Sequence, residues 1–141
     1  MSFTVDITKF ANKTKSTLDE STRAIKISLF NGVIRDTRVG NPDKWKSKPP
    51  PGYVGGRLRG NWQTTTGSPA SDELDRIDHF DIGQDGGEAM AEVKKNVRGF
   101  TVDYLANNLP YAEVYEEIDG MVAKNMARIA RIINEVNSGK R

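Results

Sequence analysis

Hydrophobic residues recur every three or four positions in three stretches of the chain, which is the spacing of one face of an α-helix. The first stretch covers roughly residues 7–34, between a candidate N-cap at Asp6 and a break at Pro42. The other two cover residues 88–97 and 121–137. We therefore predict a long N-terminal helix, a short central helix and a C-terminal helix. The apolar stripe expected on the last helix consists of Val122, Met126, Ile129, Ile133 and Val136.

Two other stretches alternate between the two faces of a strand, over residues 57–66 and 100–107. In the first, the alternation places Trp62 on one face and Arg57 and Arg59 on the opposite face. In the second, it places Tyr104 on the apolar face. We expect the two strands to pair, with Trp62 and Tyr104 in the core.

The remaining segments connect these elements. Residues 41–56 contain four prolines, and residues 70–87 are acidic and irregular, so both are predicted to be long loops. Residues 111–117 are compatible with a short helix or an extended edge. A chain of 141 residues fits one domain. The order of elements predicts an α+β fold, with a small antiparallel sheet, a long N-terminal helix and a packed C-terminal helix.

Composition narrows the chemistry further. There is no cysteine, which excludes disulfides and thiolate metal sites, and His79 is the single histidine. Lysine and arginine number 21 against 19 acidic residues, a net charge of +2 that is too small to indicate a nucleic-acid binder by itself. No apolar run approaches the ~18 residues of a membrane span, and the N-terminus lacks the pattern of a signal peptide. We expect a protein with no cofactor and no membrane partner.

The acidic segment contains part of a calcium-loop pattern. The matching residues are Asp81, Asp85, Gly86 and Glu92. However, position three of the loop is Gly83, which has no side-chain oxygen, and no helical pattern leads into the segment. We expect a solvated acidic loop rather than a calcium site. His79 has no nucleophile motif near it, and we expect it at the surface.

Basic residues gather in two places. Between residues 44 and 59, lysines and arginines are interleaved with Trp45 and Tyr53, as in proteins that stack single-stranded bases. On the C-terminal helix, Lys124, Arg128 and Arg131 share one face. One interpretation is a small DNA-binding module that uses both places. Another is that acidic and basic segments meet between the subunits of a ring, and a third is that these charges are simply solvated.

Two blocks of sequence, in their order and separation, resemble a known family. Residues 56–63 read Gly-Arg-Leu-Arg-Gly-Asn-Trp-Gln, and Gly-Ser-Pro follows at 67–69. Residues 107–113 read Asn-Asn-Leu-Pro-Tyr-Ala-Glu, and Tyr-Glu and Gly-Met-Val follow. Together with the long helix ahead of them, they resemble the neck proteins of tailed bacteriophages, also named head–tail joining, tail-completion or minor tail proteins. Where that family usually has a longer loop before Gly-Met-Val, this chain has Glu-Ile-Asp.

The resemblance implies a structural virion protein rather than an enzyme, located in the neck or tail of the virion and in the host cytoplasm during assembly. Such proteins form homo-oligomeric rings, commonly hexamers, between a connector or head-closure protein and the tail-tube or tail-terminator protein. DNA passes through the ring channel without specific binding. The ring completes the tail or joins it to the filled head, and a tail-tube terminator is the alternative within this group.

The expected contacts of such a ring follow from aromatic residues in polar loops and from the charges beside them. We expect inter-subunit or partner contacts at Trp45, Tyr53, Arg57, Arg59, Phe80 and Asp81. We expect the basic residues that face the channel to be Lys124, Arg128 and Arg131.

Overall fold

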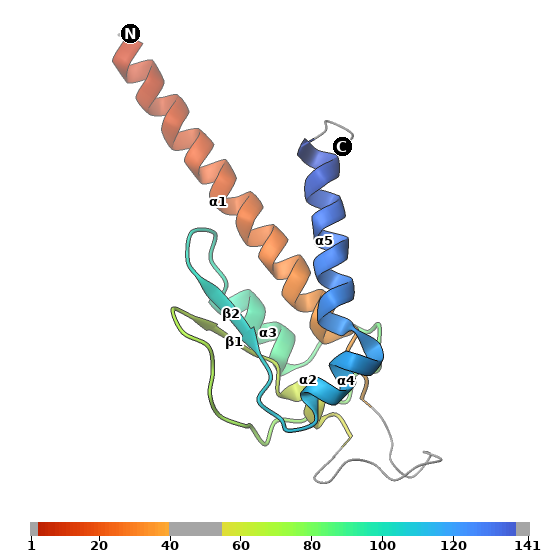
Figure 1. Cartoon of the computed structure of the whole chain (residues 1–141). Coiled ribbons are helices and arrows are strands. Elements are labelled where there is room, and N and C mark those ends of the chain that lie inside the picture. The colour runs from red at the N-terminus through yellow and green to blue at the C-terminus, as the bar shows by residue number, and fades with distance from the viewer. Residues whose placement is uncertain (1–2, 40–54, 138–141) are drawn as a thin grey trace.

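The computed structural model describes residues 3–39 and 55–137, and the side chains of residues 18–39 and 55–135. The elements in chain order are α1 (Phe3–Arg35), α2 (Arg57–Gly60), β1 (Gln63–Thr66), α3 (Glu88–Asn96), β2 (Asp103–Ala106), α4 (Ala112–Asp119) and α5 (Met121–Asn137). The predicted α+β class is confirmed, including the long N-terminal helix and the C-terminal helix. Figure 1 shows α1 running past the sheet, with its N-terminal half projecting from the body, while α5 diverges from it.

The sheet has two antiparallel strands in the described part of the chain, with Gln63 opposite Ala106 and Thr66 opposite Asp103. The predicted pairing is therefore confirmed, but both strands are shorter than predicted. Residues 57–60 form the single helical turn α2, and Leu58, Arg59 and Gly60 are all buried, which no alternating strand would allow. The turn begins at Gly56, whose φ of 83° favours glycine.

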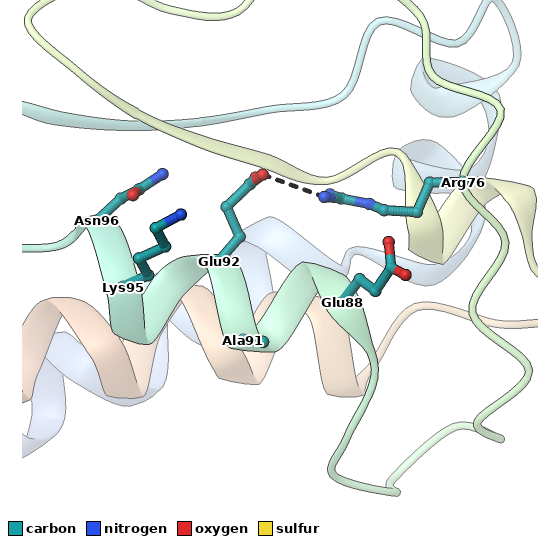
Figure 2. Close-up of a pocket in the computed structure, with 6 residues that line it drawn as sticks. All are labelled: Arg76, Glu88, Ala91, Glu92, Lys95 and Asn96. Atoms are coloured by element: carbon teal, nitrogen blue, oxygen red, sulfur yellow. Dashed lines mark hydrogen bonds and ion pairs between the residues drawn. The ribbon is translucent and has the colours of Figure 1, made fainter.

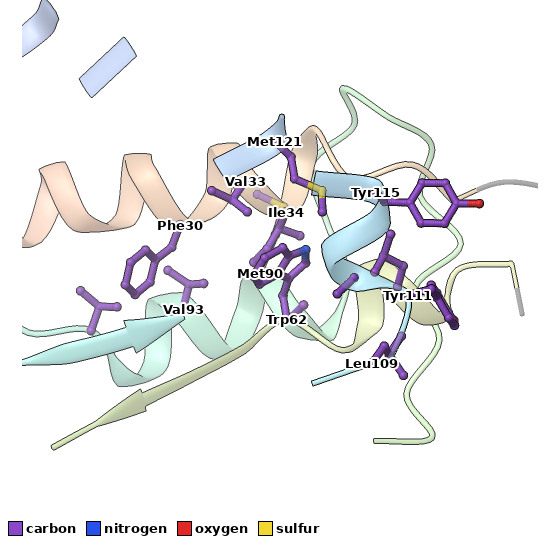
Figure 3. Packing of buried hydrophobic residues seen from close by; sticks show 14 residues of the cluster. Phe30, Val33, Ile34, Trp62, Met90, Val93, Leu109, Tyr111, Tyr115 and Met121 are labelled. Carbon is purple, nitrogen blue, oxygen red and sulfur yellow. The ribbon is translucent and has the colours of Figure 1, made fainter. Parts of the chain in front are cut away.

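The core forms where the last third of α1 meets α3, α4 and the start of β1. Trp62 lies at the centre of this cluster, beside Ile34 and Met90 (Figure 3). Its indole Nε1 donates to Thr37 Oγ1 at 2.8 Å, so the one polar atom of the ring is satisfied. The residues of the cluster are Phe30, Val33, Ile34, Leu58, Trp62, Ala89, Met90, Val93, Val97, Leu109, Tyr111, Ala112, Tyr115 and Met121.

The prediction that Tyr104 is a core residue is wrong. Leu105 packs against the core instead, and Tyr104 is only half-buried. The register explains this, because Thr64 is buried and pairs with Leu105. Residues opposite each other in an antiparallel pair share one face, so Leu105 points inward and Tyr104 points to the other side.

The apolar stripe predicted for α5 is also rotated in the structure. Met121, Asn125 and Ile129 are buried, whereas Met126 and Ile133 are exposed. Asn125 Nδ2 donates to Asp36 Oδ2 at 2.8 Å. A Cβ at Gly32 would collide with Asn125, so α1 and α5 approach closely at this glycine. A polar crossing contact thus sets the rotation of α5.

The hairpin that leads into β2 is fixed to α1 by one ammonium group. Lys26 Nζ donates to the backbone carbonyls of Arg98 (2.8 Å), Gly99 (3.1 Å) and Thr101 (2.5 Å) and to Asp103 Oδ2 (3.0 Å). The Asp103 side chain is fully buried. Burial by itself would raise the pKa of its carboxyl. Hydrogen bonds from Thr66, Lys26, Thr101 and the Arg98 backbone outweigh this effect and hold the pKa below its usual value of 3.8.

We predict that Asp103→Asn removes part of the acid sensitivity of the fold. A carboxyl whose pKa is lowered by folding stabilises the native state above its unfolded pKa, and this stability is lost as pH falls through the folded pKa. Asp103→Asn should therefore be less stable than the original protein at neutral pH. The difference should shrink below about pH 4. Urea unfolding across this range measures it.

The control is Glu73→Gln, because Glu73 is exposed. This variant should follow the original protein at every pH. A constant stability difference for Asp103→Asn from neutral to acid pH would contradict the prediction.

Candidate assembly surfaces

The segment between β1 and α3 is tied to the body by its own charged side chains. Asp78 is buried, and its carboxylate accepts from the backbone N–H of Glu88 (3.2 Å) and of Ala89 (3.4 Å). These N–H groups belong to the first turn of α3, where a carboxylate is stabilised by the helix end. The prediction of a solvated acidic loop is therefore wrong for Asp78, although most residues of the segment are exposed.

Arg76 joins the same segment to the end of α2, to the residue before β1 and to α3. Its Nε donates to the Gly60 carbonyl at 2.7 Å and its Nη2 to the Trp62 carbonyl at 2.7 Å. Nη1 pairs with Glu92 Oε2 at 3.1 Å (Figure 2). Glu92 Oε1 accepts from the N–H of Thr64 at 2.8 Å. In the shallow pocket drawn in Figure 2, Arg76 and Glu92 thus form a structural junction by binding each other.

The residues of the partial calcium pattern bind elsewhere. Asp85 Oδ1 accepts from Arg35 Nε at 2.7 Å, while Glu92 binds Arg76. Within residues 18–39 and 55–135, no three histidine, aspartate or glutamate side chains lie close enough together to hold a metal ion. His79 is exposed, as expected.

Among the predicted contact residues, the prediction for Arg59 is wrong. Its side chain is completely buried, so it cannot reach a neighbouring subunit. Its guanidinium donates to three backbone carbonyls, those of Asp81 (3.2 Å), Gln84 (2.7 Å) and Gly86 (3.1 Å). Burial lowers its pKa, and the charges of Asp78 and Asp85 oppose that effect. The Arg59 guanidinium is a fold-forming donor that holds residues 81–86 against α2.

The other predicted contact residues have different environments. Phe80 is exposed on one side, and the Arg59 guanidinium lies 5.6 Å from its ring centroid on the other. Asp81 is exposed. Arg57 is half-buried, and its nearest carboxylate is Asp75 at 3.8 Å. Trp45 and Tyr53 lie outside the described residues.

The three basic residues predicted to share one face of α5 have different environments in the structure. Arg128 binds α1, where its Nη2 donates to the Ser28 carbonyl at 2.8 Å and its Nη1 to Ser28 Oγ at 3.1 Å. Arg128 therefore serves the α1–α5 crossing, and its place at a channel stays a prediction. Lys124 and Arg131 are exposed.

The two sequence blocks that carry the family resemblance meet in the fold. Asn107 Nδ2 donates to the Leu58 carbonyl at 2.8 Å, which links the start of the second block to the middle of the first. Asn61 exchanges hydrogen bonds with the backbone of Leu74, accepting from N–H at 2.7 Å and donating to the carbonyl at 2.9 Å. Leu109, like Trp62, is a core residue. The blocks together form the structural centre of the molecule.

Two exposed helix surfaces were missed by the analysis of the sequence. The α5 outer face consists of Ala123, Lys124, Met126, Ala127, Ala130, Arg131 and Ile133. The α4 outer face consists of Glu113, Val114, Glu117 and Ile118. Both combine exposed apolar residues with charge of a single sign. Met126 is 59% exposed and Ile118 is 63% exposed. A helical wheel shows the apolar and charged residues on each side of these helices. It does not show which side faces the core.

An apolar groove lies beside the α5 outer face. It has a volume of about 150 Å³, and Met126 forms part of its rim. Its other lining residues are Leu29, Phe30, Val33, Trp62, Leu105 and Val122.

Comparisons with known proteins add no assignment to this geometry, because no protein family, no curated protein and no solved structure matches the chain. In the described part of the chain, no helix combines the length and the apolar character needed to cross a membrane.

We predict that Arg59→Met lowers the free energy of unfolding by about 2–4 kcal/mol, because it removes a buried guanidinium that donates to three backbone carbonyls. The matched control is Arg57→Met, two residues earlier on the same turn. It should cost less than about 1 kcal/mol, because the ion pair of Arg57 is long and exposed. Urea unfolding of both variants measures the two values. Equal losses would contradict the structural role of Arg59.

Proposed function

We propose that this protein is a structural component of a tailed-bacteriophage particle that forms a ring at the head–tail interface. In this role it completes the tail or joins it to the filled head, around the channel through which DNA passes. Its partners are further copies of itself, commonly six to a ring, together with the connector or head-closure protein on one side and the tail-tube or tail-terminator protein on the other. Assembly rests on shape and charge complementarity.

The observation that carries the proposal is the meeting of the two resembling blocks. They are separated in sequence by residues 64–106, yet Asn107 of the second block binds the backbone of Leu58 in the first. Trp62 and Leu109 enter one core. Sequence similarity that falls on one packed unit supports a shared fold better than similarity scattered over unrelated surface positions.

The exposed surfaces also support an assembly role. The α4 and α5 outer faces present apolar side chains to solvent, and each face has charge along one edge. Exposed apolar residues that gather beside charges are a feature of protein–protein interfaces.

The DNA-binding alternative receives less support from the geometry. Of the basic residues in the loop 44–59 and on the C-terminal helix, Arg59 and Arg128 are bound to backbone carbonyls within the fold. A cation held this way contributes little to phosphate contacts, which need a side chain free to reach the backbone of a nucleic acid.

The experiment is a stop codon early in the gene of a phage that encodes this chain, followed by electron microscopy of the lysate. The joining role predicts filled heads beside free tails of normal length. Overlong tail tubes would assign the protein to length termination instead. Infectious particles of normal appearance would contradict a structural role in the virion.

A further inference from the structure

We infer that the α4 outer face of one copy packs against the α5 outer face of the next copy. The inference rests on the proposed ring and specifies which surfaces build it. In such a ring each copy presents its α4 outer face to one neighbour and its α5 outer face to the other, so the contact is head-to-tail.

The α5 outer face consists of an apolar strip and a basic edge. Ala123, Met126, Ala127, Ala130 and Ile133 follow one another at spacings of three, one, three and three residues, which places them on one side of the helix. Lys124 and Arg131 are two turns apart and share one edge of that strip. None of the exposed residues of α5 that the structure describes is acidic. The small alanines allow another helix to approach closely.

The α4 outer face has the opposite charge. Val114 and Ile118 are four residues apart and form a short apolar strip, beside which Glu113 and Glu117 form an acidic edge. Helix α4 contains no lysine or arginine. In the part of the chain that the structure describes, neither glutamate forms an ion pair, and neither do Lys124 and Arg131 of α5.

Charge complementarity therefore selects a second copy as the occupant of each face. The acidic edge of α4 repels another α4, and the basic edge of α5 repels another α5. Each edge attracts the other, which favours the mixed contact and disfavours the two self-contacts. The apolar strips then cover each other and bury the side chains that are exposed in the single chain.

The order of residues also fixes the relative direction of the two helices. On α4 each glutamate directly precedes its apolar neighbour, whereas on α5 Lys124 and Arg131 each directly follow an alanine. Successive residues of a right-handed helix advance by about 100° in one sense. The acidic and basic edges therefore lie on opposite sides of their strips when both helices are viewed from the N-terminus. The two apolar strips can face each other, with the acidic edge of α4 beside the basic edge of α5, only if the two helices run parallel.

The test uses two full-length charge-reversal variants, Glu113→Lys/Glu117→Lys on α4 and Lys124→Glu/Arg131→Glu on α5. Each variant alone should lose self-association, by at least about tenfold in the dissociation constant, because its two faces now carry like charge. An equimolar mixture should assemble again, with the two variants alternating. A chain that carries all four substitutions should also assemble. Sedimentation velocity and negative-stain electron microscopy measure size and ring closure.

The matched control is Lys94→Glu/Lys95→Glu, which makes the same change of charge as the α5 variant, on exposed residues of α3. It should leave assembly unchanged. Assembly by either single-face variant, or failure of the equimolar mixture to assemble, would overturn the inference. So would an original protein that stays monomeric at high concentration.

The outcomes separate this inference from the proposed function. If the charge-reversal variants still form rings and the stop codon still blocks head–tail joining, the interface is wrong and the neck role stands. If the mixture experiment succeeds but the stop-codon phage is normal, the self-association stands and the neck role is wrong.

Discussion

The fold depends on arginine side chains that fix a segment with no regular structure to the elements around it. Residues 67–87 contain neither helix nor strand, yet they lie along α2 and α3. A buried carbonyl without a donor is costly, so such a segment needs partners outside itself. Arg59 donates to the carbonyls of residues 81–86. Arg76, which lies within the segment, donates to the carbonyls of Gly60 and Trp62. Without these donors α2 and the entry to α3 would have no fixed relation.

This constraint explains why the most conspicuous charged residues are structural. Lys26, Arg59, Arg76 and Arg128 all donate to backbone carbonyls within the fold. Each anchors a turn or a helix crossing that hydrophobic packing alone would leave undetermined. A small core supported in this way can hold long connections in place, and the charges that remain at the surface are then available for contacts with other molecules.

The sequence predicts the parts of the fold that depend on local periodicity. The α3 and α5 helices follow from spacing, and the antiparallel sheet follows from the order of the elements. The helical turn at residues 57–60 does not, because the same residues also alternate as a strand would. What decides between the two is the positive φ of Gly56 and the burial of Arg59, which are consequences of tertiary contacts.

The rotation of α5 is a second case of this kind. Its residues offer two apolar sides, and a helical-spacing argument cannot say which side faces the core. The hydrogen bond of Asn125 with Asp36 and the close approach at Gly32 decide it. The predicted stripe includes Met126 and Ile133, which lie on the exposed side of the helix in the structure.

The separation of charge between α4 and α5 limits the kinds of assembly that the chain can form. A two-fold dimer that paired α4 with α4, or α5 with α5, would bring like charges together, whereas a reciprocal α4–α5 pairing would not. A head-to-tail contact avoids both repulsions and leaves one unused face at each end of any open oligomer. Gly120, with φ of 62°, is the joint between the two helices. In a parallel α4–α5 contact, the angle at this joint sets the rotation from one copy to the next. The conformation of a single glycine would then determine whether the chain of copies closes into a ring.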